Sequence, residues 1–209
     1  MIDAIAATGI YVGKSILTPD TNNGLRAELL RLYADQSSEA VMRSARVSEQ
    51  ATLIPEWRGD SIAWLADAPS TKAEAAAISA IKALQLAFNA ALFTGIKQTQ
   101  LHYAHYPIGA FYKRHLDRFS ASLNSQASRG AAEPGSRRII SLVFYLNANW
   151  LQCEGGELVL YDAADEPQIR ILPKLGTMVA FRSEQFPHEV LPAIRTRLSL
   201  TGWMLAAHA

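Results

Sequence analysis

The stretch FYKRHLDRF, residues 111–119, places a histidine and an aspartate two positions apart, at His115 and Asp117. In a β-strand, residues i and i+2 project from the same face, so an imidazole and a carboxylate there can reach one ion. Two histidines and one carboxylate form the triad that holds non-haem Fe(II) and leaves further coordination positions open. The motif therefore predicts two ligands of a metal site that needs a third.

His188 is the natural candidate for the third ligand. His102 and His105 precede the motif by too few residues to face it from a separate later strand, and His208 lies at a chain end that we expect to fray. His188 follows the segment LGTMVAF at a predicted turn, where the strand ends of a jelly roll can meet.

The segment RLSLTGWM, residues 197–204, alternates in the manner of a strand with two different faces. The two faces would carry Arg197, Ser199, Thr201 and Trp203 on one side, and Leu198, Leu200, Gly202 and Met204 on the other. An arginine on the inward face needs an anion. Arg197, with the Thr201 hydroxyl beside it, makes a fork suited to a carboxylate that arrives with a ligand.

The elements that must position these residues change in type along the chain. Helices are predicted over PDTNNGLRAELLRLYADQ (19–36) and over PSTKAEAAAISAIKALQLAFNAALFTG (69–95), the second capped by Ser70 or Thr71 and ended by Gly95. After Gly95 the sequence has short aromatic or β-branched runs separated by turn residues, which predict strands. These runs are residues 97–107, 137–147, 155–162, 168–172, 175–181, 188–193 and 195–205.

Short strands at close intervals after helices predict an α+β fold, a jelly roll backed by N-terminal helices. The 209 residues suit a single domain, 1–209. We expect residues 1–95 to be mainly helical, with a mobile loop at about 41–57. Residues 96–206 would form the core, with a flexible polar insertion at about 120–136.

The composition argues against several classes of partner. The net charge is +1, which favours neither nucleic acid nor a membrane surface. A single cysteine excludes an internal disulfide and fits a reducing compartment. The N-terminal stretch has an acidic residue where a secretory signal needs basic ones, and we find no apolar run of the roughly 18 residues that a membrane span requires. The expected location is cytoplasmic.

Several fragments together resemble a known family, in the right order and at the right intervals. They are RGDSIAW (58–64), YPIGAFYKRHLD (106–117), FYLNANW (144–150), GGEL (155–158) and HEVLPAIRTRLSLTGW (188–203). They resemble the Fe(II)- and 2-oxoglutarate-dependent dioxygenases of the prolyl 4-hydroxylase superfamily, in particular the hypoxia-sensing type and its bacterial relatives. The resemblance covers roughly residues 58–204 and implies a double-stranded β-helix core.

The resemblance also implies roles for single residues. The iron ligands would be His115, Asp117 and His188. The far carboxylate of 2-oxoglutarate would be bound by Arg197 and by the hydroxyl of Tyr145, with Thr201 assisting and Tyr106 lining the co-substrate pocket.

Residues of the pocket mouth follow from the same resemblance. Asp60 would pair with Arg138, while Trp64, Trp203 and Tyr112 would form aromatic walls on the substrate side. Strand parity conflicts with two of these placements. Arg138 and Tyr145 are seven residues apart, so an unbroken strand would point them to opposite faces. We therefore expect Arg138 at the strand entrance, beyond regular alternation. Regular alternation would also point Tyr112 away from the ion that His115 and Asp117 bind.

The implied activity is oxidative decarboxylation of 2-oxoglutarate to succinate and CO2, coupled to hydroxylation, with Fe(II), O2 and ascorbate as reductant. The expected substrate is a proline in an exposed loop of a protein, with a translation factor such as elongation factor Tu as one candidate. The alternatives are a hydroxylase of free proline or another small metabolite, and a non-catalytic module that senses 2-oxoglutarate or metal. The sequence does not distinguish a monomer from a homodimer.

Overall fold

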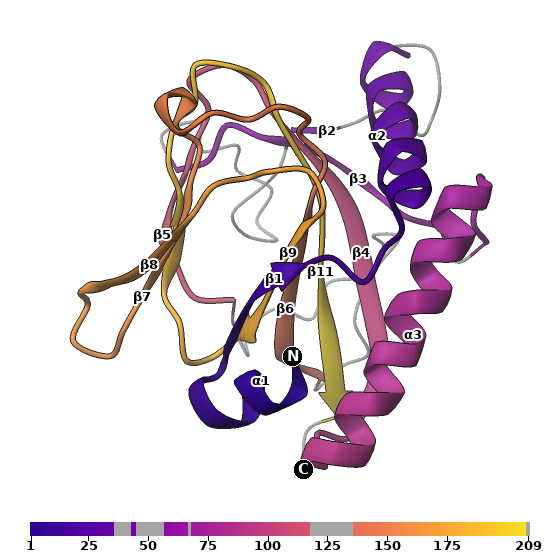
Figure 1. Ribbon diagram of the computed structural model, residues 1–209, viewed down its shortest axis with the longest axis vertical. Helices are drawn as coiled ribbons and strands as arrows, with labels where there is room; N and C mark the ends of the chain where they lie inside the picture. The colour runs from indigo at the N-terminus through magenta and orange to yellow at the C-terminus, as the bar shows by residue number, and fades with distance from the viewer. Residues whose placement is uncertain (36–42, 45–56, 67, 118–135, 208–209) are drawn as a thin grey trace.

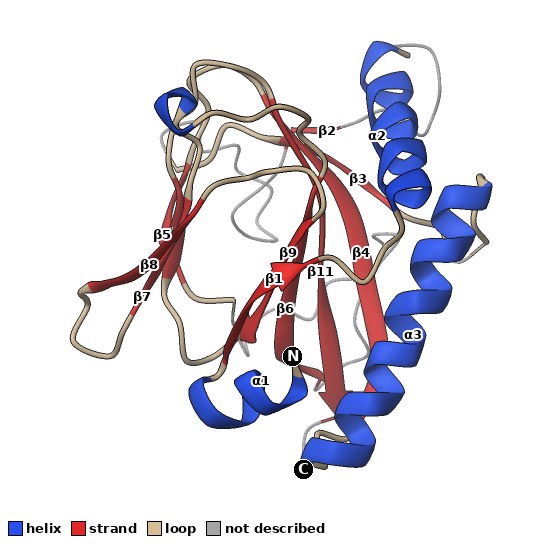
Figure 2. Cartoon of the chain, in the orientation of Figure 1, coloured by secondary structure: helices blue, strands red, loops and turns tan. Residues whose placement is uncertain are grey.

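The computed structural model describes residues 1–35, 43–44, 57–66, 68–117 and 136–207. In these residues two antiparallel sheets face each other, and the longer helices lie on the outer side of the larger sheet (Figure 1; Figure 2). This arrangement confirms the predicted α+β jelly roll backed by N-terminal helices. Its treatment as one domain stays a prediction.

The larger sheet has seven strands and the smaller has four. In spatial order the larger sheet contains β1 (Ile10–Lys14), β9 (Thr177–Arg182), β6 (Ser136–Tyr145), β11 (Arg197–Ala207), β4 (Ile96–Tyr106), β3 (Ser61–Trp64) and β2 (Arg43–Ser44). The smaller contains β5 (Tyr112–His115), β10 (His188–Val190), β7 (Leu158–Tyr161) and β8 (Pro167–Ile171).

Two hydrophobic clusters result from the alternation of side chains along the strands. One lies between the sheets and includes Tyr106, Tyr145 and Leu160. The other lies between the larger sheet and the helices, and includes Leu198 and Leu200 from β11. The two faces of β11 therefore separate as predicted, with apolar side chains toward the helices and Arg197 toward the space between the sheets.

The helices are α1 (Ile2–Thr8), α2 (Pro19–Ala34) and α3 (Lys72–Leu92), and a short 3-10 turn follows at Gln152–Glu154. Thr18 caps α2 by accepting a hydrogen bond from the Thr21 N–H. Thr71 caps α3, as predicted, and forms a reciprocal capping box with Glu74. By length and composition alone α3 could also span a membrane. In the fold its side chains Ala77, Ile81 and Phe88 are buried in the cluster beneath the helices.

Several sequence-based predictions about element boundaries were wrong. Helix α3 ends at Leu92, and its C-cap is Phe93 in a left-handed conformation (φ 51°) rather than Gly95. Strand β1 was not predicted, although it pairs with β9 at the sheet edge. Two residues of the predicted loop 41–57 form β2. The rest of that loop up to residue 56, and residues 120–135 of the predicted insertion, lie outside the described residues, while Ser136 begins β6.

An irregularity in β6 resolves the parity conflict between Arg138 and Tyr145. In the pairing with β11, Met204 lies opposite Ile140 but Leu205 lies opposite Arg138, so one residue of β6 is left over as a bulge. The extra residue turns both Arg138 and Tyr145 toward the inner face, where Arg138 packs on Trp203 and Tyr145 lies near Arg197. Arg138 therefore departs from regular alternation near the start of β6, as expected.

Candidate metal and co-substrate site

Three side chains that could hold a metal ion meet at the ends of two neighbouring strands. His115, the last residue of β5, lies directly opposite His188, the first residue of β10. Asp117 follows β5 by two residues and turns toward the same point. One ligand atom from each of the three lies within 4.8 Å of the others. The structure thus brings together the three residues that the H-x-D motif and its candidate partner predicted.

The orientation of both histidines is fixed by backbone carbonyls. The Nδ1 atom of His115 lies 2.8 Å from the Lys113 carbonyl oxygen, and that of His188 lies 3.1 Å from the Phe186 carbonyl oxygen. A carbonyl only accepts, so Nδ1 carries the proton and donates it. A neutral imidazole that donates through Nδ1 offers Nε2 as a lone pair, and the Nε2 atoms of His115 and His188 both lie 3.6 Å from an Asp117 oxygen. This is the tautomer that a metal ligand requires.

The ionisation of the site also suits a cation. Burial lowers the pKa of His115 to about 3, and the neighbouring His188 acts in the same direction, so the imidazole is neutral at physiological pH. Burial by itself would raise the pKa of Asp117, but His188, His115 and Arg138 overcome it and hold that pKa well below its usual range. Two imidazoles and one carboxylate therefore face each other, a donor set that suits Fe(II).

Asp117 is held by a hydroxyl pair that the sequence analysis missed. The Ser141 hydroxyl donates to Asp117 Oδ2 at 2.7 Å, and Ser141 and Ser183 share a second hydrogen bond of 2.9 Å. All three side chains are buried. Strand alternation could have identified Ser141, because it lies two residues before Val143 and four before Tyr145, and both of those side chains point inward from the same strand.

Arg197 lies in the same interior and is 2% exposed. Its Nε donates to the Gly156 carbonyl oxygen at 3.0 Å, and its guanidinium carbon lies 5.0 and 5.1 Å from the ring centroids of Tyr106 and Tyr145. Among the described residues it has no ion-pair partner. A buried guanidinium without a counter-ion is costly, so this one is suited to an anion that comes from solution.

Tyr145 adds a donor for that anion. Its hydroxyl is fully buried and has no hydrogen-bond partner among the described residues. Burial raises the pKa of Tyr145, so the hydroxyl keeps its proton and can donate it. The Thr201 hydroxyl lies nearby on the same face of β11, 3.2 Å from that of Ser199.

Gly156 shows how closely the chain packs around Arg197. It has a φ of +76°, and a Cβ there would lie 2.9 Å from the Cβ of Ala193 and 3.5 Å from Cδ of Arg197. The contact with Ala193 is too close and the φ is strained for any other residue, so glycine is favoured where the carbonyl meets Arg197. The guanidinium is therefore positioned before any ligand arrives.

Aromatic side chains form the walls near the metal ligands. The ring centroids of Trp64 and Trp203 are 6.1 Å apart, and His102 packs beside both. Tyr112 stacks on His115 with centroids 3.6 Å apart. The parity argument that pointed Tyr112 away from the ion was wrong, because the pairing of β5 with β10 shifts register between the two residues.

The predicted pair of Asp60 and Arg138 was also wrong. Asp60 accepts two hydrogen bonds of 2.7 Å from Arg58, two residues earlier, and the guanidinium of Arg58 lies 4.1 Å from the ring of Tyr112. Arg138 instead lies over Trp203 at 3.5 Å and reaches to 4.0 Å from Asp117. Both aspartates are buried and each faces a different arginine, so the mouth carries two separate charge clusters.

Comparison with known proteins identifies the class to which this site belongs. Residues 101–205 match the 2OG-Fe(II) oxygenase superfamily, and the chain belongs to that family. The fold is similar to the crystal structure of a Pseudomonas putida prolyl-4-hydroxylase, with a TM-score of 0.82 and 36% identity over 97% of this chain and 96% of that one.

The chain is also similar to one further solved structure and to a human protein. A Trichoplax adhaerens prolyl hydroxylase in complex with a hypoxia inducible factor peptide fragment gives a TM-score of 0.80 and 25% identity, over 97% of this chain and 86% of that one. Human Egl nine homolog 1 is 28% identical over 167 residues, which is 77% of this chain and 36% of that protein. The chain spans between 10% and 36% of the length of the curated relatives it matches.

The residues present fit the two groups that the family name requires. Two Nε2 atoms and the Asp117 carboxylate supply the donors for Fe(II). The guanidinium of Arg197 and the Tyr145 hydroxyl, which has no hydrogen-bond partner among the described residues, would suit the far carboxylate of 2-oxoglutarate. The residues present therefore fit both groups that the family name implies.

Proposed function

We propose that the protein is a prolyl hydroxylase that acts on a proline in an exposed loop of another protein, uses Fe(II), 2-oxoglutarate and O2, and releases succinate and CO2. The observation that carries the proposal is the guanidinium of Arg197, which has no ion-pair partner in the described part of the chain and is buried with the Tyr145 hydroxyl in the same interior as His115, Asp117 and His188. The similarity to the Pseudomonas putida prolyl-4-hydroxylase over nearly the full length of both chains supports the choice of proline.

The roles of the chain's own residues follow from the geometry. Bound Fe(II) would supply the oxidising chemistry with O2, as the family's name implies. His115, Asp117 and His188 would hold the metal, and the Lys113 and Phe186 carbonyls keep both imidazoles in the metal-binding tautomer.

Binding of the co-substrate at its remote end would orient its reactive end. Arg197 and Tyr145 would bind the far carboxylate of 2-oxoglutarate, so that its 2-oxo acid end points toward the metal ligands. Trp64, Trp203 and Tyr112 would keep water from the reacting atoms and pack against the flat face of a proline ring.

The substrate is tested by comparing the proteins of host cells with and without the active gene. Mass spectrometry should find one added oxygen atom on a proline of a cellular protein only when the wild-type enzyme is present. Elongation factor Tu is one candidate for that protein. Hydroxylation confined to free proline or another small metabolite would favour the alternative that the protein is a small-molecule hydroxylase. Tight 2-oxoglutarate binding without succinate release would favour a non-catalytic sensing module.

A further inference from the structure

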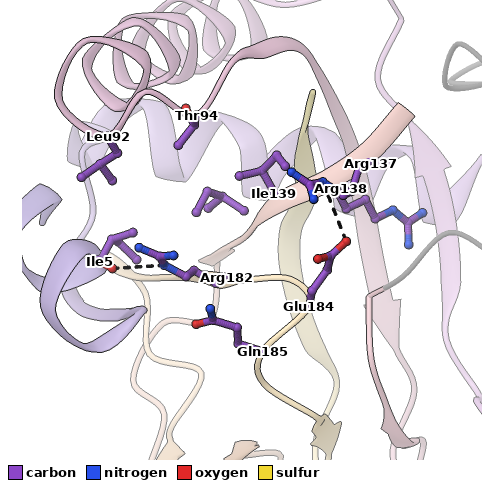
Figure 3. Close-up of a pocket in the computed structure, with 10 residues that line it drawn as sticks. Ile5, Leu92, Thr94, Arg137, Arg138, Ile139, Arg182, Glu184 and Gln185 are labelled. Carbon is purple, nitrogen blue, oxygen red and sulfur yellow. Dashed lines mark hydrogen bonds and ion pairs between the residues drawn. The ribbon is translucent and has the colours of Figure 1, made fainter. Parts of the chain in front are cut away.

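A second pocket lies on the outer side of β6 and β9 in the larger sheet, whereas the metal ligands lie at the ends of β5 and β10 in the smaller sheet. Its volume is about 250 Å³, and it is bounded by α1, the end of α3 and the ends of β6 and β9. Its floor is apolar, formed by Ile5, Leu92 and Ile140. Figure 3 shows arginine side chains from the two strands at its wall, with Glu184 and Gln185 at its edge.

The charge of the pocket is mostly positive and only partly compensated. The Arg182 Nε donates to the Ile5 carbonyl oxygen in a long contact of 3.4 Å, and its two Nη groups have no hydrogen-bond acceptor among the residues that the structure describes. The Arg137 Nε lies 3.9 Å from Glu184 Oε1, at the limit of an ion pair, and the two side chains are 50% and 42% exposed. A carboxylate of a partner could therefore bind the Arg182 guanidinium beside Ile5, while Arg137 beside Glu184 adds positive charge on the other side of the pocket (Figure 3).

The pocket lies on the outer face of the ends of β6 and β9, and the inner face of the same region contacts the metal site through Ser141 and Ser183. Arg182 and Glu184 face the pocket, whereas Ser183 between them points inward and contacts Ser141, which holds Asp117. A chain segment that places one residue near the metal ligands could place another residue over this rim. The arrangement suits recognition of a side chain at a fixed distance from the reacting one.

The size of the pocket favours a side chain over a metabolite. Sites for small molecules usually measure about 300–1,000 Å³, and this pocket is smaller. An apolar floor beneath two guanidinium groups fits a carboxylate on a short methylene stem. That is the chemistry of a glutamate or aspartate side chain.

We propose that this pocket binds an acidic side chain of the protein substrate and thereby selects which proline is hydroxylated. The inference rests on the proposed function, since it assigns a recognition element to that substrate. Arg137 and Arg182 are the specificity-determining residues. Glu184 acts as an internal competitor that occupies Arg137 until the substrate arrives.

The test uses proline-containing peptides in which one glutamate is moved through successive positions on either side of the proline, each matched by a peptide with glutamine there. At one position, the KM of the glutamate peptide should be about fivefold lower than that of its glutamine match, as expected for a half-exposed ion pair. Arg182→Gln or Arg137→Gln should abolish this difference. Glu184→Gln should enlarge it.

The matched control is Arg170→Gln on the far strand β8, which removes the same charge from an exposed site and should leave the difference intact. The proposal is overturned if no position distinguishes glutamate from glutamine, or if the difference survives both arginine substitutions. It is also overturned if free glutarate, added with 2-oxoglutarate saturating the Arg197 site, binds the wild type as tightly as the glutamate peptide does, because the pocket would then serve a metabolite.

Binding measured without oxygen separates this proposal from the proposed function. Calorimetry with Mn(II) and 2-oxoglutarate present reports peptide affinity even if no peptide is hydroxylated. An affinity difference that depends on Arg137 and Arg182 supports the pocket and leaves only the reaction in question. Equal affinity of glutamate and glutamine peptides rejects the pocket, whatever the turnover shows.

Discussion

Replacing Arg197 by methionine is the sharpest test of the co-substrate site. Methionine keeps an unbranched apolar stem, so the change mainly removes the guanidinium. The Nε of Arg197 is already used by the Gly156 carbonyl, which leaves the two Nη groups for a ligand carboxylate. A hydrogen bond to a charged group contributes about 1.5 kcal/mol at the lower end of its range, so losing two weakens binding by about 3 kcal/mol. That corresponds to an increase of about 100-fold in the Kd for 2-oxoglutarate.

The assay is calorimetric titration of 2-oxoglutarate without oxygen, with Mn(II) in place of Fe(II). Arg195→Met is the matched control, because Arg195 lies two residues earlier and binds Glu154 and backbone carbonyls near the surface instead. Its Kd should match the wild type. The rise in melting temperature that saturating 2-oxoglutarate causes should vanish in Arg197→Met only. An affinity within threefold of the wild type would remove Arg197 from the site.

Three further substitutions probe other contacts. Tyr145→Phe removes one buried donor and should raise the Kd for 2-oxoglutarate about tenfold in the same titration. Ser141→Ala frees Asp117 Oδ2 and should weaken metal binding about tenfold, measured by competition with a chelator. Burial lowers the pKa of His102 to about 3, so below pH 6.5 the unfolded chain binds a proton that the folded chain does not. The metal-free protein should therefore lose about 2 kcal/mol through His102 between pH 6.5 and about pH 5. In urea unfolding, His102→Leu should remove that loss. An unchanged affinity for 2-oxoglutarate in Tyr145→Phe, or for metal in Ser141→Ala, would contradict the role given to that hydroxyl. An unchanged dependence of stability on pH in His102→Leu would contradict the role given to His102.

The sequence was most informative where a strand alternates without interruption. The pattern from Arg197 to Met204 separated the two faces of β11 correctly, because a regular strand has a period of two. The pairing of His188 with His115 across β10 and β5 could only be proposed, since it depends on register between segments far apart in the chain. The structure supplied that register.

The errors have physical causes that a linear pattern does not carry. A bulge in β6 turned Arg138 inward, and a register shift in β5 turned Tyr112 onto His115. Asp60 took the nearer arginine because an extended segment places residues i and i+2 on one side. Phe93 adopts the left-handed conformation at the C-cap of α3, a position where residue preferences favour glycine, so Gly95 was predicted instead.

The most direct test of the central claim is succinate formation from 2-oxoglutarate with Fe(II), O2 and ascorbate, in the wild type and in Asp117→Ala. The wild type should form succinate, and should form more with a peptide substrate. Asp117→Ala should keep its circular dichroism spectrum but lose both bound iron and succinate formation, because two imidazoles alone hold the metal poorly. Succinate production by Asp117→Ala at the wild-type rate would contradict the assignment of His115, Asp117 and His188 as the metal site.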